Sequence, residues 1–251
     1  MHTPETDHFE GNNPHEHVLK KKEEMANEIH GDELPGHLGA FLDSTRDTSI
    51  LFLIFWTVCS QLGFSFAQLN FALLMLGAGW LVWKGAKSTW LANTKLERLH
   101  RILKEERFEI ENHRPQEREE LEALYAAKGF KGALLEEVLD VLMADDDRLL
   151  KVMIEEEMGL NLENCEHPLK VGSGAALGVL LAVMLLFVTT WLSPKFGLAT
   201  LAVLMIGTSG MYIAKLQKNE SIPAFVWNLG FAILTYGTVY FLTQWFLSFT
   251  Q

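Results

Sequence analysis

Charged residues are absent from two long segments of the chain and nearly absent from a third. Residues 48–83 and 222–251 contain no Asp, Glu, Lys or Arg, and residues 171–214 contain only Lys195. A helix of about 20 apolar residues spans the hydrocarbon core of a bilayer, and a charged residue at its centre costs roughly 2.5–3.5 kcal/mol. The pattern therefore predicts membrane-spanning helices in all three segments.

Five spans account for these segments. Residues 48–83 are slightly too few for two helices and a turn, so we expect the first span to begin between Pro35 and Phe41. The chain should then turn near residues 60–65, where Gly63 lies among polar residues. The remaining four spans are predicted at residues 67–83, 171–192, 196–214 and 223–249.

The early start of the first span brings acidic residues to the membrane. Asp43 and Asp47 would lie at or just inside its boundary. An acidic residue is costly there, which makes each of them a candidate for function. If the span begins later, both are interfacial residues paired with Arg46, and the sequence leaves these alternatives open.

The segment between the second and third spans is dense in charge and has a helical pattern throughout. No Gly or Pro lies between Lys87 and His113, so we expect the second span to continue as one helix that ends before Pro115. Three further helices are predicted at residues 115–128, at 132–143, and from Asp145 or Asp146 to Met158.

The predicted fold is therefore all-α, with five transmembrane helices and a cytosolic helical domain inserted between spans 2 and 3. The predicted parts are a polar tail at residues 1–34, spans 1 and 2 at 35–87, the acidic domain at 88–168, and spans 3–5 at 169–251. The tail holds five of the nine histidines, and its composition favours a solvated segment over a metal collector.

Basic residues predict the orientation of these spans. All the Lys and Arg residues that flank the spans fall on one side of the five-span arrangement, apart from Lys195. By the positive-inside rule, the N-terminus and the acidic domain are cytoplasmic and the C-terminus is on the other side. We expect a multi-pass integral membrane protein, of either a bacterial inner membrane or a vacuole-like organelle.

Composition excludes several functions. The formal net charge of −11 argues against nucleic-acid binding. The two cysteines form no CxxC motif, and there is no phosphate-binding loop, nucleophile triad or zinc-protease signature. We therefore expect no enzymatic activity and no catalytic cofactor.

Two pairs of glutamates in the acidic domain are the strongest candidates for chemistry. Glu106 and Glu109 share one helix face, and Glu117 and Glu120 repeat that spacing beyond a corner at residues 112–115. A fold-back would bring the pairs together, and converging carboxylates need a cation such as Mn(II), Mg(II), Ca(II) or Fe(II). The alternative is a solvated face of i,i+4 ion pairs.

This region resembles the cytosolic metal-binding domain of the vacuolar iron transporter (VIT) family, which exports ferrous iron and manganese. The matching stretches are EERFEIENHRPQEREELEALYAAKGF and LLEEVLDVLMADDDRLLKVMIEEEMGL, which closes on Glu157-Met158-Gly159-Leu160. In that family, two Glu-x-x-Glu pairs and a Met and a Glu near the closing motif bind transition metals. The resemblance implies as ligands Glu106, Glu109, Glu117, Glu120, Met153 and Glu157.

The membrane part departs from the family. There, span 1 carries Asp-Gly-Leu and span 2 carries Ser-Met-x-x-Gly-Glu-Tyr, and both line the ion path. Here neither Asp43 nor Asp47 is followed by Gly-Leu. No acidic residue follows Asp47 until Glu97, so the span 2 glutamate is missing. Met75 is either a remnant of the signature or a core residue. The resemblance implies a transport path through Asp43, Asp47 and Met75.

The resemblance implies a transporter that moves Fe(II) or Mn(II) out of the cytoplasm in exchange for protons, with Zn(II) as a further candidate ion. It also implies a homodimer in the lipid bilayer, with the path between subunits. The missing glutamate leaves an alternative, a membrane-tethered metal sensor or buffer that has lost transport. A third alternative is an acidic structural module that binds no metal.

Overall fold

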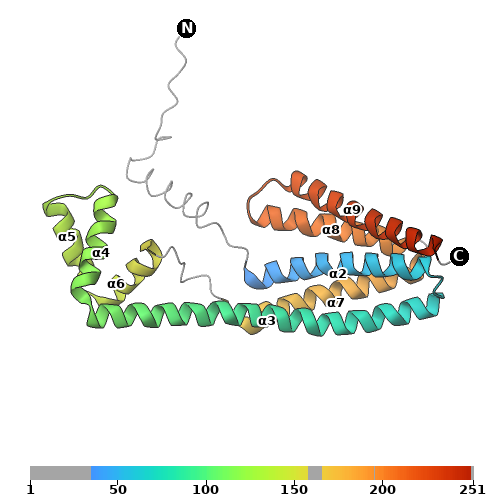
Figure 1. Cartoon of the computed structure of the whole chain (residues 1–251), viewed down its shortest axis with the longest axis horizontal. Coiled ribbons are helices and arrows are strands. Elements are labelled where there is room, and N and C mark those ends of the chain that lie inside the picture. Colours follow the sequence, from blue (N-terminus) through green and yellow to red (C-terminus); the bar gives the residue numbers. More distant parts are fainter. Residues whose placement is uncertain (1–34, 158–165, 195, 250–251) are drawn as a thin grey trace, which may run out of the picture. The chain divides into compact units, whose positions relative to one another are not determined.

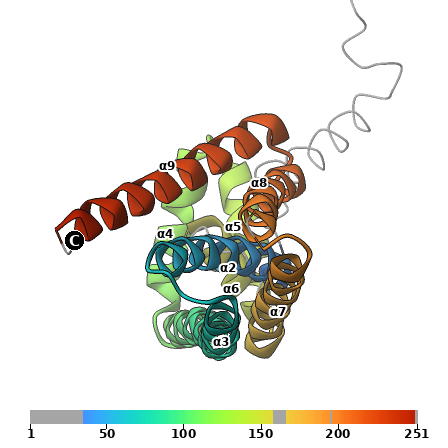
Figure 2. The same ribbon diagram turned by 90° about the vertical axis from the view of Figure 1, so that its right-hand side faces the viewer.

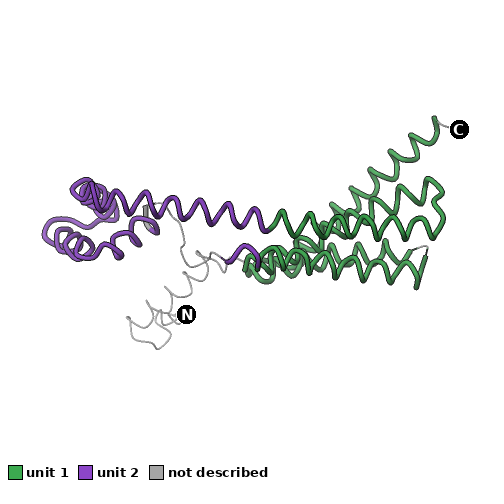
Figure 3. The backbone as a smooth tube through the Cα atoms, turned by 90° about the horizontal axis from the view of Figure 1, so that it is seen from below, with its two compact units in different colours: residues 1–88, 170–251 green, residues 89–169 purple. Residues whose placement is uncertain are grey.

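A computed structural model describes residues 35–157, 166–194 and 196–249, and every regular element within these ranges is a helix (Figure 1). The predicted all-α class is confirmed. The chain divides into two compact units: residues 1–88 and 170–251 make up unit 1, and residues 89–169 make up unit 2 (Figure 3). The histidine-containing tail, residues 1–34, lies outside the described residues.

Unit 1 begins with a helical hairpin. Helix α2 (Gly36–Gln61) is followed by a short turn in which Gly63 adopts φ +78°, a conformation that glycine tolerates best. Helix α3 (Phe66–Asn112) starts with a capping box, in which Gln68 accepts a hydrogen bond from the Ser65 backbone N–H (3.0 Å). The predicted turn at residues 60–65 is confirmed.

Helix α3 contributes to both units. It runs for 47 residues without interruption, with its first half in unit 1 and its second half in unit 2. It ends at Asn112, three residues before Pro115, as the absence of helix-breaking residues predicts. One continuous helix therefore begins among the apolar helices and carries the first glutamate pair.

Three more helices complete unit 1: α7 (Pro168–Leu192), α8 (Gly197–Leu216) and α9 (Ser221–Ser248). Among the described residues, four helices are long and apolar enough to cross a membrane, namely α3, α7, α8 and α9. Helix α2 is not one of them, because Asp43, Arg46 and Asp47 make its first half polar. These four helices agree with the predicted membrane protein, and the five-span topology stays a prediction.

Helix α2 nevertheless lies in the middle of unit 1, in contact with α3, α7, α8 and α9 (Figure 2). Glycines allow α7 to approach it closely. A Cβ atom on Gly174 or Gly178 would come within 2.2 Å of the carbonyl oxygen of His37 or Phe41, respectively. Such backbone contacts are typical of helices packed within membranes.

The core of unit 1 lies along α2, with Phe52, Leu73, Leu186 and Leu198 almost fully buried. Helix α9 differs from its neighbours, because Ala232 alone is buried among its described residues. It also diverges from the other helices toward its C-terminal end (Figures 2 and 3). Its apolar surface is suited to contact with lipid.

Unit 2 consists of the end of α3 with helices α4 (Arg114–Ala127), α5 (Ala133–Met143) and α6 (Asp146–Val152), followed by the π-helix η1 (Met153–Glu157). Helices α4 and α5 begin and end within one residue of their predicted positions, and α6 begins at Asp146, as predicted. Asp145 caps α6 by accepting a hydrogen bond from the Arg148 N–H (2.8 Å). The predicted end of the last helix, at Met158, lies outside the described residues.

Leucine and isoleucine side chains from all of these helices form one core in unit 2. Each of the five most buried is at most 1% exposed. They are Ile110, Leu121, Leu139, Leu149 and Ile154. This core holds α4 against the last turns of α3, which is where the two predicted glutamate pairs lie.

Candidate metal centre

The corner between α3 and α4 is tight. His113 leaves the helical conformation (φ −126°, ψ 31°), and its carbonyl oxygen accepts hydrogen bonds from the backbone N–H groups of Gln116 (2.9 Å) and Glu117 (3.2 Å). Pro115 suits the first turn of α4, where a missing N–H is harmless. The chain therefore turns sharply within a few residues, and α4 leaves the end of α3 at a steep angle (Figure 1).

This corner brings three of the predicted glutamates together. Glu106 and Glu109 of α3 and Glu117 of α4 each offer a carboxylate oxygen, and these three oxygens lie within 4.8 Å of one another. Glu106 and Glu117 are each only 3% exposed, whereas Glu109 is open to solvent. The cluster thus has a buried side and an accessible side through which an ion could enter.

The spacing is close to that of a coordinated cation. Carboxylate oxygens bind transition-metal ions at about 2.0–2.2 Å, so three oxygens spaced equally around one ion are at most about 3.8 Å apart. An inward movement of up to about 1 Å would bring the three oxygens to that spacing. Two carboxylates buried side by side also repel each other unless a cation or a proton neutralises them.

The other three predicted ligands are placed differently. Glu120 is exposed and does not join the cluster of the described residues. Met153 is 1% exposed and lies in the core that contains Ile110 and Leu121, at the start of the π-helix η1. Short π-helical segments are frequent at functional sites. The side chain of Glu157 lies outside the described part of the chain.

Arginines hold the helices around this cluster in place. Arg114 donates hydrogen bonds to Asp146 (2.6 Å) and to the carbonyl oxygen of Met143, so it links the start of α4 to the junction of α5 and α6. Arg107 of α3 pairs with Asp147 of α6 (3.1 Å). Arg101 and Glu105 form an i,i+4 ion pair within α3 (3.9 Å), as the alternative interpretation predicts. The ion pairs made by Arg114 and Arg107 instead connect different helices.

Arg118 forms a similar link between α4 and α5, because it contacts both Glu136 (2.5 Å) and Asp140 (3.3 Å). The hydrogen bond to Glu136 raises the pKa of the Arg118 guanidinium, and the nearby carboxylates act in the same direction. Burial raises the pKa of the Tyr125 hydroxyl, which packs against the same core. Both groups therefore keep their protons at neutral pH.

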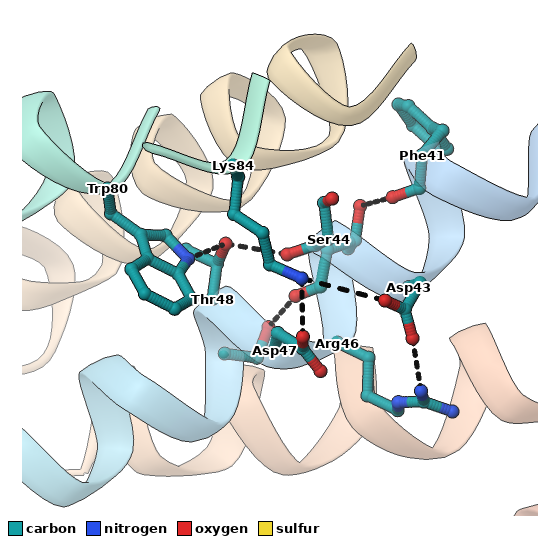
Figure 4. Close-up of polar contacts among 10 residues, drawn as sticks. Phe41, Asp43, Ser44, Arg46, Asp47, Thr48, Trp80 and Lys84 are labelled. Carbon is teal, nitrogen blue, oxygen red and sulfur yellow. Dashed lines mark hydrogen bonds and ion pairs between the residues drawn. The ribbon is translucent and has the colours of Figure 1, made fainter. Parts of the chain in front are cut away.

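A second charged cluster lies in unit 1, and Figure 4 shows its contacts. The ammonium group of Lys84 on α3 lies 2.5 Å from Asp47 and 3.5 Å from Asp43, both on α2. Arg46 pairs with Asp43 on its other side. The structure thus brings together the two aspartates that the sequence places near the membrane boundary, and it adds a lysine between them.

The third residue of the expected transport path is elsewhere. Met75 is 55% exposed on α3. It precedes Lys84 by nine residues, which corresponds to roughly 13 Å along a helix. The described structure therefore does not bring Met75 to the two aspartates.

Sequence reasoning assigned Lys84 only to the set of basic residues that indicate orientation. One signal could have revealed its contact with Asp47. The two helices are antiparallel about the turn at Gly63, and Trp80 of α3 donates a hydrogen bond to Thr48 of α2 (3.2 Å). Residues at similar distances from such a turn face each other, which places Lys84 near Asp47.

Comparison with known families identifies the chain. The profile of the VIT family matches residues 90–244, well over half of the sequence. The chain belongs to the VIT family. No curated protein matches it. The match covers unit 2 and most of α7–α9, but it does not extend over α2 or the first part of α3, where the sequence departs from the family signature.

Membership of the VIT family has two consequences. Together with the long apolar helices, it makes this an integral membrane protein. It indicates transport of metal ions across a membrane rather than enzymatic activity. The matched region also includes the three converging glutamates of unit 2.

Proposed function

We propose that this VIT-family protein exports divalent transition-metal ions from the cytoplasm, with Fe(II) and Mn(II) as its cargo and protons as the coupling ion. The observation that carries the proposal is the convergence of carboxylates from Glu106, Glu109 and Glu117 at the corner of α3 and α4. Unit 2 would collect the ion, and the membrane unit would move it.

The chemistry of the available ligands favours these ions. Carboxylate oxygens alone suit Mg(II), Ca(II) and Mn(II), whereas a thioether prefers softer transition metals. Met153 is buried in the core that also contains Ile110 of α3 and Leu121 of α4, and the family resemblance implies its sulfur as a further ligand. A set of carboxylates with one thioether favours Fe(II), Mn(II) and Zn(II) over Ca(II) and Mg(II).

The proposal includes five spans, with the N-terminus and unit 2 in the cytoplasm. Helix α2 has 26 residues and is therefore about 39 Å long, enough to cross a hydrocarbon core of about 30 Å. Its charges are compensated, because Lys84 and Arg46 pair with its two aspartates. Its central position among the apolar helices also supports a membrane location. A homodimer would supply the helices that one protomer lacks for enclosing a path.

Two observations favour a second function, metal binding without transport. Asp43 and Asp47 are already neutralised by Lys84 and Arg46, and the span 2 glutamate of the family is missing. A membrane-tethered sensor or buffer would need unit 2 but no conducting path.

Uptake of Mn(II) into proteoliposomes tests the first function against the second. The full chain should move Mn(II) down an applied gradient, and the double variant Glu106→Gln with Glu117→Gln should lose at least nine-tenths of that flux. Glu119→Gln is the matched control, because Glu119 is exposed on the same helix and lies outside the cluster.

Calorimetry with the same variants separates the outcomes. Saturable Mn(II) binding with no flux identifies a sensor or buffer. If the chain neither binds nor moves Mn(II), Fe(II) or Zn(II), both functions are wrong, and unit 2 is a structural module.

A further inference from the structure

Lys84 has an unusual position for a lysine in a membrane protein. Its side chain is only 8% exposed, whereas the carboxylates that it contacts, Asp43 and Asp47, are 47% and 37% exposed. The cation is therefore the most buried member of the cluster. Its ammonium group lies between the two carboxylates, as Figure 4 shows.

We propose that Lys84 is a tethered counter-ion that occupies the cation position between Asp43 and Asp47. A divalent metal ion then binds this aspartate pair only when it displaces the lysine ammonium group. This inference rests on the proposed function, because it gives the two aspartates a role in handling metal. It assigns to Lys84 a regulatory role that neither the family match nor the glutamates of unit 2 imply.

The charges in the cluster make the two cations mutually exclusive. Asp43 and Asp47 carry two negative charges, and Arg46 and Lys84 carry two positive charges, so the cluster is neutral as it stands. A divalent ion placed beside Lys84 would meet a positive charge within a few ångströms in a partly desolvated site, where such repulsion is strong. With the ammonium group displaced, the remaining three side chains carry a net negative charge that attracts metal.

Lys84 is better suited to displacement than Arg46. Arg46 lies on the same helix as the aspartates and contacts Asp43 from one turn away. Lys84 instead reaches across from α3 with a flexible stem, and a compact ammonium group makes weaker geometric demands than a guanidinium. Release of Lys84 would also break an ion pair between α2 and α3.

Other contacts hold the resting position of Lys84. The ring centroid of Trp80, one turn earlier on α3, lies 5.8 Å from the ammonium nitrogen, and the indole N–H is fixed by Thr48. Beyond Thr48, α2 contributes Phe52 to the apolar core, which it shares with Leu73 of α3. Lys84 thus lies at the polar end of the α2–α3 contact, at the end where α3 continues toward unit 2.

Metal binding to the full chain in detergent tests this inference. Glu106→Gln and Glu117→Gln are introduced first to remove the proposed centre of unit 2, and Mn(II) binding is measured by electron paramagnetic resonance. In this background Lys84→Met should bind Mn(II) at least tenfold more tightly than the parent. Lys87→Met is the matched control, because Lys87 is exposed on the same helix and should change nothing.

Two further variants test whether the tighter Mn(II) binding depends on the aspartates and on loss of the positive charge of Lys84. Adding Asp43→Asn with Asp47→Asn to Lys84→Met should abolish the tightened binding. Lys84→Arg keeps the positive charge and should bind Mn(II) as weakly as the parent. If Lys84→Met binds no more tightly than Lys84→Arg, or if its gain persists without the aspartates, the inference is wrong.

A measurement on the native lysine covers the case in which Lys84→Met does not fold. The amine of Lys84 is labelled with an acylating reagent and quantified by mass spectrometry, with Lys87 as the internal reference. Millimolar Mn(II) should raise the labelling of Lys84 several-fold and leave Lys87 unchanged, whereas unchanged labelling of Lys84 would overturn the inference. Neither readout measures flux, so a chain that binds metal at the aspartates but does not transport it would contradict the proposed function alone.

Discussion

At the scale of single residues, burial separates the four predicted glutamates. Glu106 and Glu117 are almost fully buried, whereas Glu109 and Glu120 are exposed. The i,i+3 spacing predicts that each pair shares a helix face and that both pairs come together, whereas the corner at His113 brings three of the four together. It could not show that Glu120 stays outside, because that depends on how far α4 diverges from α3 beyond the corner.

The pairing of Lys84 is the residue-scale feature that sequence reasoning missed. A scan for charge treats each charged residue separately, and it judges Asp43 and Asp47 by their depth in the membrane. Asp43 pairs with Arg46, as one alternative allowed, but the partner that the two aspartates share is Lys84, which lies on the next helix 37 residues after Asp47. Only the register of the α2–α3 hairpin, set by a turn of a few residues, places the lysine beside them.

Arg114→Ala tests the contribution of the arginine links to unit 2. The change removes an ion pair with Asp146 and a hydrogen bond to the Met143 carbonyl oxygen, and we expect a loss of about 1–2 kcal/mol in the stability of unit 2. Amides of α4–α6 should then exchange with deuterium roughly tenfold faster in the full chain. Arg101→Ala, which removes only an exposed pair with Glu105, should leave exchange unchanged. Equal exchange in both variants would mean that the links contribute nothing.

At the scale of elements, most helices could be predicted from the positions of Gly, Pro and charge. The continuous helix α3 follows from the absence of breakers up to Pro115, and the α2–α3 turn follows from Gly63. The π-helix η1 could not be predicted, because a change from α to π hydrogen bonding inside a helix has no clear composition signal. The packing partners of α2 were also not predictable from its own sequence.

A pair of glycine substitutions tests the packing of α7 on α2. A Cβ on Gly178 would come within 2.2 Å of the Phe41 carbonyl oxygen, whereas a Cβ on Gly79 in α3 would meet nothing within 4 Å. We expect Gly178→Ala to destabilise unit 1 by about 1–3 kcal/mol and to lower the thermal unfolding midpoint in detergent. Gly79→Ala should be neutral or slightly stabilising, because alanine favours the helix. A midpoint for Gly178→Ala at or above that of Gly79→Ala would show that the close approach is absent.

At the scale of the whole molecule, segregation of charge predicts a membrane protein from the sequence alone, and the family match and four long apolar helices agree. The status of α2 is different. Three charged residues lower the hydropathy of α2 below that of a typical membrane span. The ion pairs by which Lys84 neutralises its aspartates are visible only in the folded unit. The number of spans therefore depends on tertiary contacts that no hydropathy profile includes.

Thiol labelling across the membrane tests whether α2 spans it. In a chain with Cys59→Ser and Cys165→Ser, single cysteines are placed in the N-terminal tail (Glu10→Cys) and in the α4–α5 loop (Lys131→Cys). With five spans both lie in the cytoplasm, so a membrane-impermeant reagent should label neither in intact cells and both after permeabilisation. If α2 does not span, the two positions lie on opposite sides, and one of them will be labelled in intact cells.

The central claim is that carboxylates from two successive helices of unit 2 hold a divalent cation, and the position of Mn(II) in a structure of the full chain tests it most directly. The account predicts an anomalous scattering peak about 2.2 Å from carboxylate oxygens of Glu106, Glu109 and Glu117. The peak should disappear in the Glu106→Gln, Glu117→Gln variant. A structure grown in saturating Mn(II) that has no peak at the α3–α4 corner, with these side chains turned apart, would contradict it.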